Sequence, residues 1–146
     1  MTIADKTVLV TGANRGIGQA LVEEALKRGA KRVYAGTRQP MTHVDGRVTP
    51  LALDVTNAEQ IQAAVKRVGS LDVLINNAGI ALYDDLSNLD TIGQHFAVNL
   101  FGMFNVTRAV IATARKLTVL LHRLWVSGEA YEPLRNSHQS ALPAAA

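Results

Sequence analysis

Residues 11–18, Thr-Gly-Ala-Asn-Arg-Gly-Ile-Gly, decide how this 146-residue chain folds. They follow the apolar run Lys6–Val10, which is typical of a strand buried on both faces of a parallel sheet. After them, apolar residues recur at helical spacing as far as Leu26, and Gly29 suits the end of a helix. A glycine turn between a strand and a helix presents unpaired amides to an anion. The sequence therefore predicts a phosphate-binding loop here.

Each glycine of this loop has a separate predicted task. Gly12 permits the tight turn, Gly16 removes the side chain where backbone meets ligand, and Gly18 lets the helix lie close to the strand. The predicted phosphate-binding residues are Gly12, Asn14, Arg15, Gly16, Ile17 and Gly18.

Outward from the loop, strand and helix patterns alternate. Further strands are predicted at Arg32–Gly36, Val48–Asp54 and Leu71–Ile75, with Pro50 indicating an edge strand. A capping box with Thr56 as N-cap begins a helix that buries Ile61, Ala64, Val65 and Val68 and ends at Gly69. A long helix is predicted over about 89–116, and Leu117–Val126 fits a helix end or a fifth strand. The alternation favours an α/β fold with a parallel sheet.

Composition excludes several classes of function. The chain has no Cys, so disulfides and thiolate metal sites are excluded, and the four dispersed His residues suggest no metal. The net charge of +3 is scattered and aromatics are 5%, which argues against nucleic-acid binding. No apolar run of about 18 residues and no secretory signal is visible, so we expect a cytoplasmic protein with no membrane contact.

The glycine spacing Gly-x-x-x-Gly-x-Gly, together with Asn76-Asn77-Ala78-Gly79 after the fourth strand, resembles the short-chain dehydrogenase/reductase family over about positions 5–110. The resemblance implies a Rossmann-type, doubly wound parallel sheet, of which this chain holds the N-terminal four to five strands in the order 3-2-1-4-(5). It also implies an oxidoreductase that moves a hydride between NAD or NADP and a small-molecule carbonyl or alcohol.

NADP is the cofactor expected from the end of the second strand. An NAD site usually has a carboxylate there, about 20 residues past the glycines. Here the sequence continues Thr37-Arg38-Gln39, and no carboxylate follows until Asp45. Arg38 suits a 2′-phosphate, and Arg15 could close the other side of a clamp. The alternative is that both are solvated surface arginines.

The resemblance assigns further cofactor contacts after strands three and four. It implies that Asp54 accepts from the adenine amino group and that Val55 packs on the ring, although a helix N-terminal acid is an alternative role for Asp54. Asn76, Ala78 and Gly79 are expected to line the cofactor ribose, with a plain turn as the alternative.

Asn99 is a polar residue on an apolar helical stripe, which comprises Ile92, Phe96, Asn99, Met103, Val106 and Val110. A buried amide needs a hydrogen-bond partner. One interpretation is a structural asparagine. The resemblance offers another, because Val98-Asn99-Leu100 matches the family's catalytic asparagine, which distorts the helix and holds a water of the proton relay.

The Ser and Tyr-x-x-x-Lys on which the family's catalysis depends are not recognisable. Tyr131-Glu132-Pro133-Leu134-Arg135 mimics the spacing, but Pro133 disfavours a continuous helix, so Tyr131 is a weak candidate acid. We expect a domain over 1–115 and a divergent, poorly packed tail over 116–146, as in a truncated family member. The alternative function is an NADP-binding fragment or interaction module. A homo-oligomer, or pairing through the exposed sheet edge, is expected.

Overall fold

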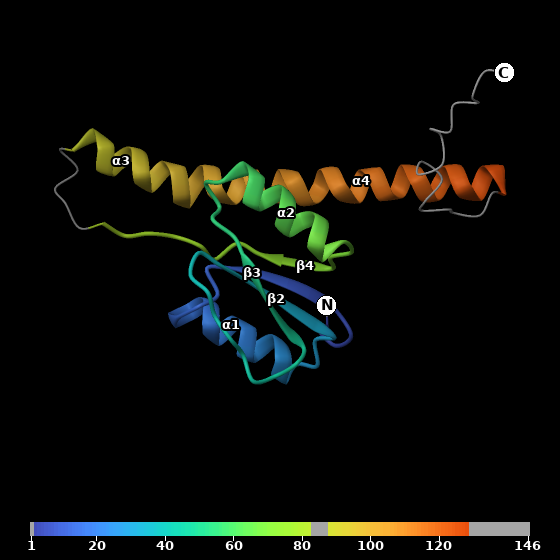
Figure 1. The fold of residues 1–146 in the computed structure, drawn as a ribbon, viewed down its shortest axis with the longest axis horizontal. Coiled ribbons are helices and arrows are strands. Elements are labelled where there is room, and N and C mark those ends of the chain that lie inside the picture. The colour runs from blue at the N-terminus through green and yellow to red at the C-terminus, as the bar shows by residue number, and fades with distance from the viewer. Residues whose placement is uncertain (1, 83–87, 129–146) are drawn as a thin grey trace, which may run out of the picture. The chain divides into compact units, whose positions relative to one another are not determined.

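The computed structural model describes residues 2–82 and 88–128. Its elements alternate as predicted (Figure 1). In chain order they are β1 (Thr7–Thr11), α1 (Gly16–Lys27), β2 (Arg32–Thr37), β3 (Val48–Ala52), α2 (Ala58–Val68), β4 (Val73–Ile75), α3 (Leu89–His95), the π-helix η1 (Phe96–Gly102) and α4 (Met103–Ser127).

The strands form one parallel sheet in the order β3-β2-β1-β4, which confirms the predicted α/β class and the order 3-2-1-4. Pro50 of β3 lies opposite Ala35 of β2, and among the described strands β3 pairs with β2 alone, so the predicted edge strand is confirmed. A proline is tolerated there because its missing N–H would face away from the sheet. Leu117–Val126 is helical, and the residues described contain no fifth strand.

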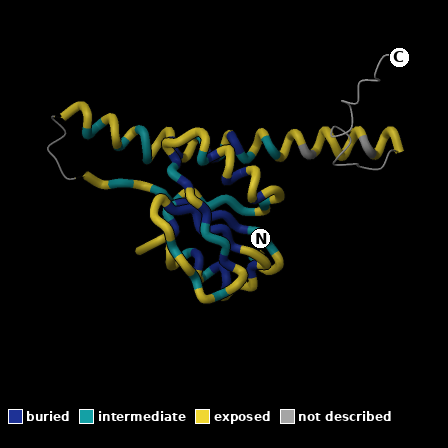
Figure 2. The backbone as a smooth tube through the Cα atoms, in the orientation of Figure 1, coloured by how far each residue is buried: buried dark blue, intermediate teal, exposed yellow. Residues whose placement is uncertain are grey.

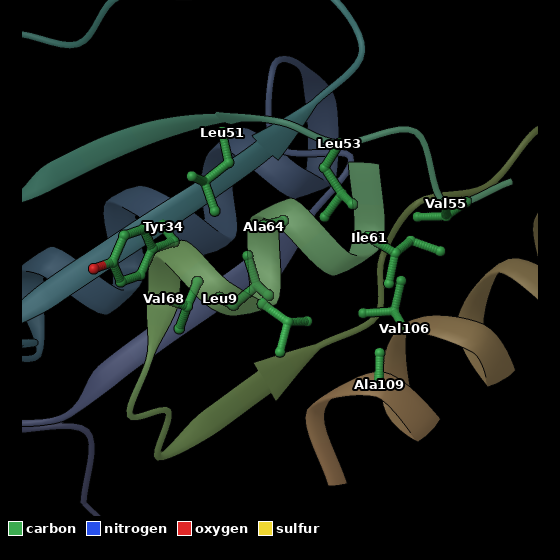
Figure 3. Close-up of a cluster of buried hydrophobic side chains, with 11 residues drawn as sticks. Leu9, Tyr34, Leu51, Leu53, Val55, Ile61, Ala64, Val68, Val106 and Ala109 are labelled. Atoms are coloured by element: carbon green, nitrogen blue, oxygen red, sulfur yellow. The ribbon is translucent and has the colours of Figure 1, made fainter. Parts of the chain in front are cut away.

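Two apolar clusters cover the two faces of the sheet. On one face, α2 and the first turns of α4 pack on the strands; Figure 3 shows Leu9, Ile61 and Val106 converging there. On the other face, Val22 and Leu26 of α1 pack on β1 and β2. Figure 2 shows the buried backbone concentrated in the strands. All four residues of the predicted α2 stripe are buried, which confirms that periodicity.

The predicted capping box at α2 is wrong by one residue. Asn57 is the N-cap, and its side-chain oxygen accepts from the Gln60 amide at 3.0 Å. The Thr56 hydroxyl donates instead to Asp54 Oδ1 at 2.7 Å. Because the preceding carboxylate holds this hydroxyl, the next polar side chain caps the helix.

The long helix contains the π-helical segment η1, so the stripe predicted through Asn99 is only partly correct. Phe96 and Met103 are 52% and 45% exposed, whereas Gly102, Val106 and Ala109 are buried. In a π-helix each amide bonds five residues back, so the face of the helix rotates away from the ideal 3.6-residue period.

The chain divides into two compact units, Met1–Ala114 and Arg115–Ala146. Within Arg115–Gly128, every side chain that the structure describes is exposed. The helical stretch Leu89–Ser127, with a mean hydropathy of 1.3 in its most apolar window, is long and apolar enough to cross a membrane by length and composition alone. Core helices of soluble proteins pass the same test, so the absence of membrane contact stays a prediction.

Candidate active site

The carboxyl ends of the parallel strands surround a cavity of about 540 Å³ within the first unit. Ligands of open α/β sheets bind at this edge, and the volume is within the usual range for small-molecule sites. The segments after β1, β2, β3 and β4 all contribute, together with one residue of η1. The lining residues are Gly12, Asn14, Arg15, Gly16, Ile17, Gly18, Arg38, Gln39, Leu53, Asp54, Val55, Asn77, Ala78, Gly79, Ile80 and Val98.

Backbone packing explains the glycines of the first loop. A Cβ on Gly12 would lie 2.8 Å from the Ala78 Cα, and one on Gly18 would lie 2.0 Å from the Gly12 carbonyl oxygen. Gly16 differs, because a Cβ there would meet no atom within 4 Å. Its φ of +53° is one that glycine adopts readily. Two glycines therefore let the loop, α1 and the segment after β4 approach closely, while the third leaves open backbone beside the cavity.

The N-terminus of α1 carries no side-chain cap. Arg15 occupies the N-cap position in an extended conformation, and its side chain makes no capping hydrogen bond. The amides of the first helical turn therefore remain available to an anion in the cavity.

Thr11 joins the loops that follow β1 and β4. Its buried hydroxyl accepts from the backbone amides of Asn77 and Ala78, both at 3.0 Å. The Asn77 side-chain amide in turn donates to the Thr11 and Gly12 carbonyl oxygens at 3.0 and 3.1 Å. The sequence-based prediction missed Thr11 as a site residue, and it included Asn77 in the segment after the fourth strand without giving it a separate contact. A hydroxyl residue that ends a strand directly before a glycine turn could have indicated Thr11.

The structure places Asn76 away from the cavity lining. Its side-chain amide donates to the Thr107 hydroxyl of α4 at 3.0 Å. Ala78 and Gly79 do line the cavity, as does Asn77. Successive residues at the end of β4 therefore serve different purposes, with Asn76 joining the loop to α4 and Asn77 joining it to β1.

Two guanidinium groups and one carboxylate give the cavity its charge. Arg15 and Arg38 are exposed, and neither guanidinium has a hydrogen-bond or ion-pair partner within the residues that the structure describes. Burial alone would raise the pKa of Asp54, but hydrogen bonds from Thr56 and the attraction of Arg38 hold that pKa below its usual range. Asp54 is therefore ionised at neutral pH, and Arg38 lies close enough to interact with it.

The side-chain amide of Asn99 makes two hydrogen bonds with the backbone of Ile80. Its Oδ1 accepts from the Ile80 N–H and its Nδ2 donates to the Ile80 carbonyl, each at 2.8 Å. One turn earlier, His95 Nε2 accepts from the Leu82 N–H at 2.9 Å. In this structure Asn99 is a positioning residue for the cavity wall at Ile80, and it is exposed rather than part of the buried stripe.

The remaining catalytic candidate, Tyr131, lies outside the described residues. Among residues 2–82 and 88–128, the tyrosine present is Tyr34, which is buried in the core of β2. Within the same ranges no group of His, Asp and Glu is arranged to hold a metal ion.

The cavity fits a dinucleotide. Open backbone at Gly16 and an uncapped helix N-terminus suit a pyrophosphate, and flanking arginines suit a further anion. An open parallel sheet with a glycine loop and a cavity at the carboxyl ends of its strands is typical of nucleotide-binding proteins of the Rossmann type.

Comparison with known proteins narrows this class. The chain belongs to the short chain dehydrogenase family, whose model matches residues 6–117. It is 34% identical over 122 residues to the 3-oxoacyl-[acyl-carrier-protein] reductase FabG of Vibrio cholerae, covering 76% of this chain and 50% of the relative. The chain spans about half the length of the curated relatives that it matches.

Solved structures of relatives hold both kinds of nicotinamide cofactor. A short chain dehydrogenase from Burkholderia cenocepacia in complex with NADP is 36% identical, with a TM-score of 0.74, over 80% of this chain and 51% of that one. A short chain dehydrogenase from Leptospira borgpetersenii with bound NAD+ is 29% identical, with a TM-score of 0.65, over 73% of this chain and 45% of that one.

Proposed function

We propose that this chain binds NADP(H) in the cavity and supplies the cofactor-binding part of an oxidoreductase that acts on a small-molecule carbonyl or alcohol. The observation that carries this proposal is that two guanidiniums, Arg15 and Arg38, lie beside the cavity and that neither is engaged in a hydrogen bond or ion pair with a described residue. The position after β2, where an NAD site has its carboxylate, holds Arg38 and Gln39. A 2′-phosphate would satisfy both arginines.

Each part of the cavity has a role in this proposal. The amides of the first turn of α1, approached over Gly16, hold the pyrophosphate. Asp54 accepts from the adenine amino group, and the buried Val55 packs on the ring. Asn99 holds Ile80, and with it the wall of the cavity beyond Gly79. When bound, the nicotinamide supplies or accepts the hydride.

Nucleotide titration of the purified chain tests the proposal. NADPH should bind more tightly than NADH. Arg38→Asp should weaken NADPH by about tenfold or more, because a hydrogen bond to a charged group contributes roughly 1.5–3 kcal/mol. The same change should not weaken NADH, and the new carboxylate should strengthen NADH binding because it can accept a hydrogen bond from the ribose 2′-OH.

Lys31→Asp is a matched control for this titration. It makes the same change in net charge at an exposed position just before β2, at the end of the strand away from the cavity. Equal affinity of the wild-type chain for NADPH and NADH would contradict the proposed preference.

A second candidate function is an NADP-binding module that does not turn over substrate. The observation in its favour is that no described tyrosine lies at the cavity, while the Asn99 amide is engaged by Ile80. Oxidation of NADPH with a panel of ketones separates the two functions. Turnover that is lost in Tyr131→Phe supports the enzyme and assigns the acid, whereas NADPH binding without turnover supports the module.

We also propose that β4 is a pairing edge. Among the described strands β4 pairs only with β1, and its outer backbone groups are free to accept a further strand from a second copy. A concentration series by light scattering tests this, and a monomer at every concentration would contradict it.

A further inference from the structure

The loop between β2 and β3, residues 38–47, is fastened to α1 by side chains that the proposed function does not use. Its first two residues, Arg38 and Gln39, line the cavity. Further along, the His43 ring contacts Glu23 of α1, with Nε2 lying 3.0 Å from the Glu23 Oε1. The His43 side chain is 12% exposed, so this contact is set into the surface rather than lying on it.

The hydrogen bonds of His43 define its tautomer. Its Nδ1 accepts from the Asp45 backbone N–H at 3.0 Å, so the neutral ring carries its proton on Nε2 and donates it to Glu23. One side chain therefore holds the loop backbone at one ring nitrogen and α1 at the other. A neutral ring suffices for both bonds.

The far end of the loop is held separately. The Arg47 guanidinium bonds both carboxylate oxygens of Asp45, at 2.7 to 3.2 Å. It also donates to the Leu26 carbonyl oxygen at 3.2 Å, in the last turn of α1, and to the Ala30 carbonyl oxygen at 3.5 Å, between α1 and β2. Arg47 thus anchors the loop near β3. Nearer Arg38 the loop is held by the polar contact of His43 with Glu23 and by Met41, which packs against the core cluster that includes Val22 of α1.

The two arginines of the cavity lie on segments that the His43–Glu23 contact joins. Arg15 directly precedes α1, and Arg38 begins the loop that Glu23 and His43 fasten to the same helix. We propose that His43, through Glu23, is a positioning residue that holds Arg38 where a nucleotide 2′-phosphate binds between Arg38 and Arg15. The inference rests on the proposed function and deepens it, because it assigns the NADPH preference partly to residues outside the cavity.

Nucleotide affinities of single variants test the inference. Glu23→Ala and His43→Ala should each raise the Kd for NADPH by about fivefold, since an Arg38 side chain that the loop no longer positions must be ordered on binding. The Kd for NADH should not change, because NADH lacks the 2′-phosphate. Glu23→Gln should stay close to wild type, because its Oε1 can still accept from His43.

The neighbouring residue provides the matched control. Glu24 of α1 pairs with Arg28, directly after the helix, at 2.6 Å, and among the described residues it makes no hydrogen bond or ion pair with the loop. Glu24→Ala should therefore leave both affinities unchanged. If His43→Ala does not fold, Glu23→Ala and Glu23→Gln carry the test, since Glu23 is 56% exposed.

The outcomes separate this inference from the proposed function. A selective loss of NADPH affinity in Glu23→Ala, restored in Glu23→Gln, supports it. Equal weakening of NADPH and NADH, or the same effect in Glu24→Ala, overturns it while the NADP site stands. A wild-type chain that does not prefer NADPH overturns the proposed preference and this inference together.

Discussion

Two parts of the same helix show how differently similar residues are used in this chain. Val106, in the first turns of α4, is 1% exposed and packs in the core cluster of the first unit. Val126, near the end of the same helix, is 72% exposed. The two valines have the same side chain and the same secondary structure. An apolar residue is therefore buried only where a neighbouring element offers a complementary face.

The largest expected effect is at Gly18, a buried and closely packed position of the first unit. Gly18→Ala would place a methyl group 2.0 Å from the Gly12 carbonyl oxygen, which is backbone and cannot rotate away. We expect a loss of about 3 kcal/mol in the free energy of unfolding, because overpacking of this kind costs typically 1–3 kcal/mol or more. Urea denaturation followed by circular dichroism measures it.

Gly93→Ala is the matched control for that substitution. Gly93 lies in α3, and a Cβ there would meet no atom within 4 Å. Alanine favours a helix over glycine by roughly 1 kcal/mol, so this variant should be as stable as wild type or more stable. Similar losses in both variants would show that the close approach at Gly18 is not the cause.

The second largest effect concerns the two valines of α4 and what each contributes to the free energy of unfolding. Val106→Ala removes buried methyl groups and should cost about 2 kcal/mol of unfolding free energy. Val126→Ala, in the same helix, should change it by less than about 0.5 kcal/mol. Parallel urea titrations check the difference, and equal effects would mean that the end of α4 is packed as tightly as its start.

A third, smaller effect concerns Asn99. Asn99→Ala leaves the Ile80 N–H and carbonyl without their side-chain partner, although water can replace part of the loss at this exposed position. We expect a destabilisation of about 1 kcal/mol. Gln94→Ala, at an exposed position of α3, should be neutral. Hydrogen exchange of the Ile80 amide should become faster in Asn99→Ala alone, and unchanged protection would contradict the assignment.

The smallest effect is a pH dependence at the loop that carries Arg38. Hydrogen bonds from Arg47 lower the pKa of Asp45 to about 2. Because the folded pKa lies below the unfolded value of about 3.9, the ion pair stabilises the fold above pH 4, and this contribution is lost as the pH falls toward 2. The difference in Tm between wild type and Asp45→Asn should therefore shrink over that range. A constant difference would rule out the Asp45 charge as its origin.

Much of the first unit could be predicted from the sequence, because its patterns are local. The glycine turn, the apolar strands and the stripe on α2 each depend on residues close together in the chain, and Pro50 identified an edge strand. The cavity-lining residues after β1, β2 and β3 follow from the same elements, since parallel strands bring their carboxyl ends to one edge.

Other features of the fold and of the site depend on side-chain contacts that a local sequence pattern does not show. Asn57 rather than Thr56 caps α2, because Asp54 holds the Thr56 hydroxyl. Asn76 contacts α4 although Asn77, an identical residue beside it, contacts β1. The resemblance implied a distorted helix at Asn99, and η1 is centred there, but the apolar stripe was drawn with regular helical spacing and η1 shifts its phase. The bonds of His43 and Arg47 to α1 could not be seen in the spacing of residues 39–47.

The pairing of β1 with β4 has a consequence for synthesis. Val8 lies beside Val73, and the Thr11 hydroxyl meets the amides of Asn77 and Ala78, across more than sixty intervening residues. Contacts of such long sequence separation form slowly, since a large loop must close before they are made. On the ribosome, β1 and β2 can pair early, but the glycine loop between β1 and α1 is completed only after the segment beyond β4 has emerged. Nascent chains that end before the segment beyond β4 should therefore be unable to bind nucleotide.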